Sequence, residues 1–292
     1  LKSDYLTQGP KIKEFEEAFA SYVGCKYAIA VNNATAALHL AATALDVNPG
    51  DKVIVTPLTF AASANCIRYR GGEVVFCGVE EDTYLMDIKK LSRLLSQSPK
   101  GTYKGIVLVD FAGYPANLEA FRQLADEYGL WIIEDACHAP GGYFIDSKGE
   151  KQLCGNGNFA DVSVFSFHPV KHIATGEGGM ATTNCKELYE KLCLYRTHGI
   201  TKNPALLHEN HGGWYYEMQE LGYNYRITDF QAALGISQLK RADMGLARRQ
   251  EIARRYREGL SDLKGVKLPF VSDQVFHAYH LFIIQVEDRL GL

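Results

Sequence analysis

Short apolar runs alternate along much of the chain with longer segments in which apolar residues recur every three or four positions. Uninterrupted apolar runs of strand length are typical of strands buried on both faces of a parallel sheet. These runs are Tyr27–Val31, Lys52–Thr56, Val74–Val79, Gly105–Val109, Leu130–Glu134, Val162–Phe167 and Met180–Thr183. The longer segments predict helices over residues 11–23, 32–45, 60–69, 88–95, 117–128 and 185–196. This alternation predicts an α/β fold with a mainly parallel central sheet and helices on both faces.

The pattern changes in the remaining parts of the chain. Residues 141–158 are glycine-rich and polar, which predicts irregular structure, and residues 200–220 predict an ordered loop with an aromatic cluster at Trp214–Tyr216. Helices are expected over Phe230–Leu239 and, as a long charged linker, over Asp243–Leu263, followed by a strand at His280–Val286. We therefore expect a large cofactor-binding domain over residues 1–240. Residues 241–292 would form a connecting helix and the start of a small C-terminal α+β domain.

Composition narrows the classes of function. The 292 residues carry a net charge of −3, with basic and acidic residues interspersed, so no basic stripe indicates a nucleic-acid or membrane-surface partner. The apolar runs are too short for a transmembrane helix, and no signal peptide is visible. The 7 cysteines are scattered and form no C-x-x-C pair, which favours a reducing cytoplasm and argues against a zinc site.

Four chemically distinctive residues each follow directly after a predicted strand. Thr35, Phe60, Asp135 and Lys171 occupy these positions. Ligands of parallel α/β sheets bind beyond the carboxyl ends of the strands, where such residues meet. The sequence therefore predicts one ligand site built from all four.

Lys171 and Asp135 carry the chemistry of this predicted site. Lys171 follows a buried strand among apolar neighbours, where loss of hydration favours the neutral amine that attacks carbonyl groups. The alternative for Lys171 is an ordinary surface lysine in a hairpin loop. Asp135 ends a buried strand, where a carboxylate is costly unless it is paired, and a protonated ring nitrogen would be a fitting partner. The alternative for Asp135 is a capping residue of the next turn.

The lysine segment resembles a known family. Ser166-Phe167-His168-x-x-Lys171, followed by Gly176-Glu177-Gly178-Gly179, is similar to the cofactor-lysine segment of the nucleotide-sugar aminotransferases of DegT/DnrJ/EryC1/StrS type. The resemblance runs from Leu6–Pro10 to the helix beyond Gly235. It implies the large domain of fold type I, pyridoxal 5′-phosphate as cofactor, and a C-terminal domain longer than residues 241–292.

The resemblance also implies roles for individual residues. Lys171 would bind the cofactor covalently and move protons, and Asp135 would keep the cofactor's ring nitrogen protonated. Ala34, Thr35 and Ala36 would form the phosphate seat, and the hydroxyl of Ser166 would also bind the phosphate. Phe60 would stack on the cofactor ring, and His138 would contact the ring hydroxyl. Relatives often carry Ser and Gly where this chain has Asn32-Asn33-Ala34, and the same turn can form with either set.

Two further residues imply a dimer. Asn224 matches a family position that binds the cofactor phosphate of the neighbouring subunit, and Arg226 accompanies it as a substrate-binding candidate. Without the resemblance, both would be interpreted as polar residues of a loop that leads into a helix. The implied assembly is a homodimer with a composite active site.

The implied reaction is a ping-pong transamination. An amino group would pass from a donor, L-glutamate by resemblance, to the 4-keto carbon of a UDP-linked deoxy-N-acetyl sugar. Within the family, Leu6–Pro10, Phe167–Lys171 and the segment from Trp214 to Asn224 are most similar to enzymes that make a pseudaminic acid precursor for surface polysaccharides.

Three alternatives remain. A sugar dehydratase of the same fold would carry histidine at the position of Lys171. A regulatory protein would bind the cofactor without turnover. A nicotinamide enzyme would need G-x-G-x-x-G after the first strand, and residues 32–38 lack it.

Overall fold

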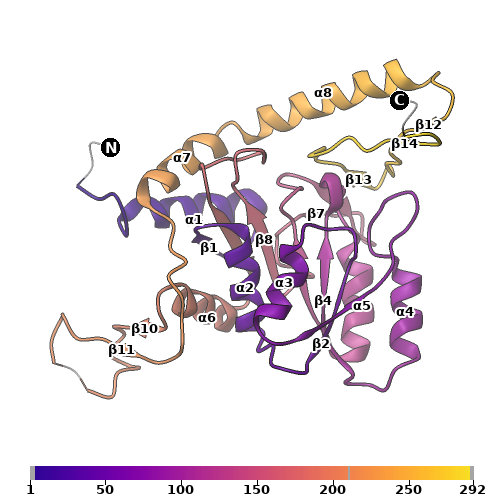
Figure 1. Ribbon diagram of the computed structural model, residues 1–292. Coiled ribbons are helices and arrows are strands. Elements are labelled where there is room, and N and C mark those ends of the chain that lie inside the picture. The colour runs from indigo at the N-terminus through magenta and orange to yellow at the C-terminus, as the bar shows by residue number, and fades with distance from the viewer. Residues whose placement is uncertain (1–3, 210, 290–292) are drawn as a thin grey trace.

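A seven-stranded sheet forms the centre of the computed structural model, which describes residues 4–209 and 211–289 (Figure 1). Its strand order is β1-β9-β8-β5-β4-β2-β3. The strands are β1 (Tyr27–Val31), β2 (Lys52–Val55), β3 (Glu73–Phe76), β4 (Tyr103–Val109), β5 (Trp131–Asp135), β8 (Val162–Ser166) and β9 (Gly179–Thr183). Only β9 runs against its neighbours, since it pairs antiparallel with both β1 and β8. The predicted α/β fold with a mainly parallel sheet is confirmed.

Helices cover both faces of this sheet. They are α1 (Pro10–Val23), α2 (Ala34–Ala44), α3 (Ala62–Tyr69), α4 (Ile88–Ser96), α5 (Leu118–Tyr128) and α6 (Lys186–Arg196). Alternate strand residues point to opposite faces. Ile133 therefore lies in the cluster formed with α2, α3 and α6, whereas Ile132 lies in the cluster formed with α4 and α5. Phe15 and Phe19 of α1 pack over β8 and β9, on the same face of the sheet as the Ile132 side chain.

Two more helices follow the sheet. α7 (Asp229–Leu239) begins at Thr228 with a reciprocal capping box to Gln231. α8 (Ala242–Leu260) then runs along one edge of the molecule (Figure 1). Within the described ranges, 4–209 and 211–289, no helix is both long enough and apolar enough to cross a membrane.

The segment after α8 returns to the large sheet region. β12 (Val266–Lys267) pairs with β14 (Gln285–Val286), and β13 (Val275–Phe276) pairs with β6 (Tyr143–Ile145). β6 also pairs with β7 (Lys151–Leu153), so the prediction of irregular structure over 141–158 was wrong in part. The division at residue 240 stays a prediction.

The strand expected at His280–Val286 is present only at its end. Residues 277–281 instead run against the 3₁₀ turn η1 (Phe111–Gly113). The amide of Ala278 donates to the Gly113 carbonyl at 2.7 Å, and the amide of Leu281 donates to the Ala112 carbonyl at 3.0 Å. Backbone groups of this segment thus find partners in a loop rather than in a strand. This contact brings His280 close to the carboxyl ends of the large sheet.

Candidate active site

A cavity of about 370 Å³ lies at the carboxyl ends of the parallel strands. Its lining comes from the start of α2, the segment after β2, the ends of β5 and β8, and the turn between β8 and β9. Most of the predicted site residues line it, namely Ala34, Thr35, Phe60, Asp135, His138, Ser166 and Lys171. The convergence expected from the positions of these residues after strand ends is therefore present in the structure.

Three predicted residues do not line this cavity. Ala36 is buried in the first turn of α2, behind Ala34 and Thr35. Asn224 is exposed, and its Oδ1 accepts a hydrogen bond from Nε of Arg226 at 2.9 Å. Arg226 lines a separate surface cavity together with Arg196. A single chain thus does not bring Asn224 or Arg226 to its own cavity.

Asp135 is buried at the end of β5 and is held by two donors. Its Oδ2 accepts a hydrogen bond from the Ser63 hydroxyl at 2.6 Å, and its Oδ1 accepts one from the Cys137 amide at 3.3 Å. The Ser63 hydroxyl also contacts the Thr59 hydroxyl at 2.7 Å. Ser63 could not be predicted as a site residue, because a serine inside an otherwise ordinary helical pattern carries no local sign of its partner. These contacts fix the direction in which Asp135 faces the cavity.

Lys171 lies in the turn after β8, half-buried. The turn is closed by backbone bonds, since the Phe167 amide donates to the Gly178 carbonyl at 2.8 Å and the Thr175 amide donates to the Phe167 carbonyl at 2.9 Å. Burial lowers the pKa of the Lys171 amine below its ordinary value, and Cys137 and Asp135 act in the opposite direction. The shift favours the neutral amine, as the sequence predicts.

The start of α2 offers a seat for an anion. Asn33 caps the helix, because its Oδ1 accepts a hydrogen bond from the Ala36 amide at 2.8 Å. The amides of Ala34 and Thr35 belong to the first turn, where N–H groups have no partner within the helix. Gly179 makes this arrangement possible, since a Cβ there would lie 2.7 Å from the Ala34 nitrogen. The asparagine at position 33 therefore caps the start of α2 and keeps the turn that the phosphate seat needs.

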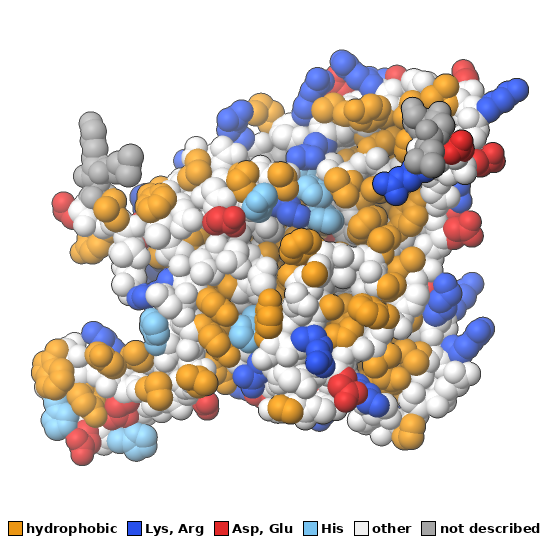
Figure 2. Space-filling model, viewed as in Figure 1, with side chains coloured by type: hydrophobic (Ala, Val, Ile, Leu, Met, Phe, Trp, Pro, Cys, Tyr) orange, Lys and Arg blue, Asp and Glu red, His pale blue; other side chains and the backbone are white. Residues whose placement is uncertain are grey.

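His138 lies beside Lys171 and is neutral. Burial, followed by the charge of Lys171, lowers the pKa of His138 to about 3. Its Nδ1 accepts a hydrogen bond from the Ala112 amide at 3.3 Å, so the ring proton sits on Nε2. The ring also stacks on His280 with 4.3 Å between ring centroids. Figure 2 shows histidine side chains gathered around a basic side chain in the hollow below α8.

Comparison with known proteins places this geometry in a family. A model of the DegT/DnrJ/EryC1/StrS aminotransferase family matches residues 1–290. The chain belongs to this aminotransferase family. Pyridoxal 5′-phosphate (PLP) is the cofactor of the family, so the predictions of a PLP-dependent sugar aminotransferase and of its cofactor are confirmed.

The aminotransferase has named relatives. It is 40% identical to the spore coat polysaccharide biosynthesis protein SpsC of Bacillus subtilis, over 99% of this chain and 72% of SpsC. It is 44% identical to the UDP-4-amino-4,6-dideoxy-N-acetyl-β-L-altrosamine transaminase of Campylobacter jejuni, over 88% of this chain. The aligned part spans 63% of that relative's length.

Solved structures agree with the fold. PseC of Helicobacter pylori, an aminotransferase involved in the biosynthesis of pseudoaminic acid, superposes with a TM-score of 0.86 at 33% identity, covering 99% of this chain and 73% of PseC. Spr1654 of Streptococcus pneumoniae, solved in a PLP form, superposes with a TM-score of 0.85 at 30% identity, covering 98% of this chain and 73% of its own. The aminotransferase therefore has the fold type I architecture.

The residues of the aminotransferase cavity fit PLP. The cofactor carries an aldehyde, a pyridine nitrogen, a flat ring and a phosphate. The cavity presents an amine of lowered pKa at Lys171, a buried acid at Asp135 and a helix start at Ala34. Phe60 lines the cavity with 76% of its surface exposed, which leaves a ring face open for stacking.

A second acidic group lies directly behind the site. Asp110 and Glu134 are both buried, and their carboxylates lie within 4.8 Å of each other and of the Cys154 thiol. One oxygen of each accepts a backbone amide, from Ala116 at 2.8 Å and from Gly155 at 3.0 Å. The other oxygens, Asp110 Oδ2 and Glu134 Oε1, have no other partner in the part of the chain that the structure describes. Burial raises the pKa of both carboxyls, which favours a proton shared between them.

Glu134→Gln is expected to flatten the pH dependence of stability. The folded pair keeps a proton that the unfolded chain releases in the ordinary carboxyl range, near pH 4. The contribution of this pair to the free energy of unfolding should therefore fall as pH rises above that range, by up to about 1.4 kcal/mol per pH unit for one proton, and the parent and Glu134→Gln should differ in slope by that amount. Glutamine supplies a permanent N–H donor to Asp110, which removes this contribution.

Urea unfolding between about pH 5 and 8 measures the slope. Glu258→Gln, on the exposed part of α8, is the control and should keep the parent slope. Equal slopes for the parent and Glu134→Gln would show that the pair does not share a proton.

Proposed function

We propose that this aminotransferase moves the amino group of L-glutamate to the 4-keto carbon of a UDP-linked deoxy-N-acetyl sugar, in the cytoplasm, as a step toward pseudaminic acid or another surface polysaccharide precursor. The observation that carries the proposal is the meeting of Lys171, Asp135 and the start of α2 in one cavity. The names of the Campylobacter and Helicobacter relatives support a nucleotide-linked amino sugar, and that of the Bacillus relative supports a polysaccharide pathway.

Each cavity residue has a proposed task. Lys171 would bind the cofactor, and Phe60 would stack on its ring. Ala34 and Thr35, at the start of α2, would form the phosphate seat together with the hydroxyl of Ser166, and Ala36 would support it from behind in the same turn of the helix. His138, whose Nε2 carries the ring proton, would donate to the ring hydroxyl of the cofactor. PLP, when bound, supplies an electron sink for the pair of electrons left when a C–H bond of the substrate is broken.

The protein's own groups move and hold the protons. Once the amine of the donor has displaced it, the neutral amine of Lys171 would take the proton from the carbon that carries the substrate nitrogen and return it to the cofactor carbon on the other side of that nitrogen. Asp135, oriented by Ser63 and the Cys137 amide, holds a proton at the ring nitrogen throughout. Because Asp135 is buried, water only weakly screens the attraction between its carboxylate and the protonated ring nitrogen.

Transfer of labelled nitrogen tests the proposal. The protein is incubated with ¹⁵N-labelled L-glutamate and a panel of UDP-4-keto sugars, and the products are weighed by mass spectrometry. We expect one sugar of the panel to gain the labelled amino group. Cofactor binding without an aminated product from any keto sugar would favour a regulatory role and contradict the proposal.

A composite site is the second part of the proposal. Asn224 and Arg226 lie outside their own cavity, and we propose that Asn224 serves the cofactor phosphate of a second copy, while Arg226 contacts substrate. The preceding arm, residues 200–209 and 211–220, projects from the body of the molecule (Figure 1) and exposes 71% of Trp214 and 53% of Tyr216. Exposed aromatic residues on a projecting arm support a subunit interface at this position.

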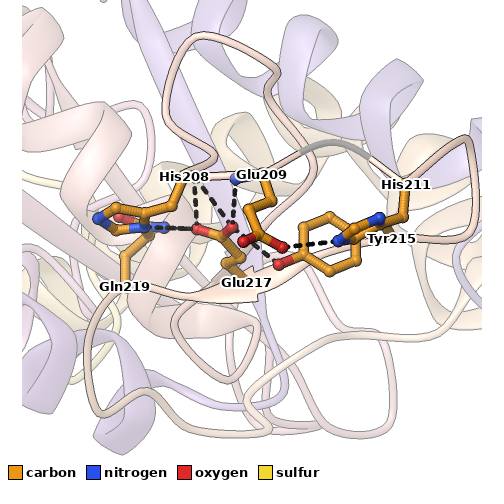
Figure 3. A network of polar contacts seen from close by, with 6 residues as sticks. All are labelled: His208, Glu209, His211, Tyr215, Glu217 and Gln219. Atoms are coloured by element: carbon orange, nitrogen blue, oxygen red, sulfur yellow. Dashed lines mark hydrogen bonds and ion pairs between the residues drawn. The ribbon is translucent and has the colours of Figure 1, made fainter.

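The arm is ordered by one carboxylate. Glu217 of β11 (Glu217–Met218) accepts hydrogen bonds from the His208 amide at 2.9 Å and from the Tyr215 hydroxyl at 3.0 Å (Figure 3). The His208 amide is the largest of the causes that lower the pKa of Glu217 to about 2. The arm therefore keeps its shape through charged hydrogen bonds at neutral pH.

Mixed dimers should recover activity that neither variant has alone. Lys171→Ala chains are mixed with Asn224→Ala chains under conditions that allow subunit exchange. One site of each mixed dimer then has both residues intact, so activity per mixed dimer should approach about half of the parent value. The amination assay measures the recovery. If subunit exchange is demonstrated and no activity is recovered, Asn224 acts in the site of its own subunit or does not act at the cofactor.

A further inference from the structure

A basic side chain close to the active site lacks a carboxylate partner. Arg249 lies on the side of α8 that faces residues 277–281, and its NH1 donates to the Tyr279 carbonyl at 3.2 Å. No ion pair of Arg249 occurs within residues 4–209 and 211–289, whereas Arg248, Arg254 and Arg255 of the same helix all pair with glutamates. Burial lowers the pKa of Arg249 as well. An arginine that is partly buried and unpaired is typical of a site for a ligand anion.

Two histidines next to Arg249 also lack partners. Both ring nitrogens of His172 and Nδ1 of His280 are buried without a hydrogen bond in the described part of the chain. The two rings meet edge to face with 5.7 Å between centroids, and His280 stacks on His138 of the cavity. A buried imidazole N–H without an acceptor is destabilising unless a ligand supplies one.

The charges around these histidines all have one sign. Burial is the main cause that lowers the pKa of His172 to about 3 and of His280 to about 4, and the charges of Arg249 and Lys171 add to it in both cases. Both rings are therefore neutral, and each carries one N–H. The carboxylate of the cavity, Asp135, is already engaged by Ser63 and the Cys137 amide. The cluster thus has N–H donors and positive charge, but no negatively charged group of its own to match them within the described ranges.

We infer that Arg249, His172 and His280 bind the α-carboxylate of the amino-acid donor. The inference rests on the proposed function and adds the residues that recognise the donor. In an α-amino acid the carboxylate is attached to the same carbon as the reacting amine, so it must lie close to the amine of Lys171. His172 is the residue after Lys171 in the chain, and His280 feels the charge of Lys171.

The other anion in the reaction fits this position less well. In the sugar substrate, the diphosphate is separated from the reacting 4-keto carbon by the width of the sugar ring. It would therefore lie away from Lys171 when the keto carbon is in place. A diphosphate also carries more charge than one arginine and two neutral imidazoles would match. The carboxylate is the better occupant on both counts.

Arg249→Met tests the inference in the holoenzyme. The first half-reaction is followed by the visible absorbance of the bound cofactor after addition of L-glutamate, which needs no sugar. Loss of the charged hydrogen bonds should raise the half-saturating glutamate concentration about 10- to 100-fold, with a smaller change in the limiting rate. Arg249→Lys should recover part of the loss. Arg254→Met, which breaks an exposed pair with Glu258 on the same helix, is the matched control and should behave as the parent.

A second variant tests the inference in case Arg249→Met does not fold. His172→Phe keeps a flat ring and removes both unpartnered nitrogens, so stability should be unchanged or higher. If His172 only filled space, glutamate would saturate this variant at the parent concentration. We expect a rise of about tenfold instead.

Two calorimetric titrations separate the possible anions. Glutarate has carboxylates but no amine, and its affinity should fall in Arg249→Met by a factor similar to that of glutamate. UDP affinity should be unchanged. Weaker UDP binding with normal glutarate binding would assign the cluster to the diphosphate, and unchanged binding of both would leave Arg249 without a ligand role. Either result overturns the inference.

The two proposals fail in different ways. A parent enzyme that reacts with no amino acid would sink the proposed function. The glutarate titration would still decide on the Arg249 site, because it depends on neither turnover nor the identity of the sugar.

Discussion

Lys171→Ala should abolish transamination, with a loss of turnover of at least about 10²- to 10⁴-fold. The amine of Lys171 has two proposed tasks, binding the cofactor and moving the substrate proton, and alanine removes both. Burial lowers the pKa of this amine, so the parent holds a reactive neutral fraction that a surface lysine lacks. Amination of the keto sugar measures the loss.

Two control variants separate the amine from the charge. Lys171→Arg keeps a cation in the turn but presents no neutral amine, and it should be as inactive as Lys171→Ala. Lys148→Ala removes an exposed lysine of the turn between β6 and β7 and should keep parent activity. An active Lys171→Arg enzyme would show that charge, rather than the amine, is what the site needs.

Asp135→Asn should reduce turnover by about 10²- to 10³-fold while leaving cofactor binding largely intact. Asparagine has nearly the same shape and can still accept the hydrogen bond from Ser63, which in the parent is 2.6 Å long. It carries no negative charge, so it cannot hold a proton on the ring nitrogen. Steady-state kinetics with cofactor titration separate the two effects.

The partner of Asp135 gives a graded comparison. Ser63→Ala removes one orienting hydrogen bond but leaves the charge, so its loss of turnover should be much smaller than that of Asp135→Asn. Asp273→Asn, at an exposed position, is the charge control. Equal turnover for Asp135→Asn and the parent would contradict the role of Asp135 as the holder of the ring proton.

The position of the site could be predicted because the carboxyl ends of parallel strands lie at the same edge of the sheet, whatever the order of the strands. Asp135 and Lys171 follow strands β5 and β8, which are parallel neighbours, so their ends meet whatever the details of packing. Thr35 and Phe60 follow β1 and β2, which run in the same direction. Apolar runs of strand length were enough to locate all four residues.

Contacts between distant segments could not be predicted. Ser63 reaches Asp135 across 72 positions, and His280 reaches His138 only because residues 277–281 run against η1. The same loop contact explains why the strand expected at His280–Val286 was wrong over most of its length. Apolar periodicity describes what a segment buries, and it carries no information on which backbone groups a loop will satisfy.

The buried pair of Asp110 and Glu134 could not be predicted for a related reason. Glu134 lies inside a strand that is otherwise apolar, and nothing local indicates that its carboxylate lies within 4.8 Å of that of Asp110, which follows the last residue of β4. Asn224 is the reverse case, because the resemblance alone suggested its role and a single chain leaves it outside the cavity. Its role in the neighbouring site stays a proposal until the mixed-dimer experiment is done.

Reductive trapping tests whether Lys171 is the residue that binds the cofactor. Borohydride is added to the cofactor-loaded protein, the chain is digested, and the peptides are weighed by mass spectrometry. We expect that one peptide gains the mass of the reduced cofactor and that fragmentation places this mass on Lys171. Attachment to a peptide without Lys171, or no attachment at all in a protein that binds the cofactor, would contradict it.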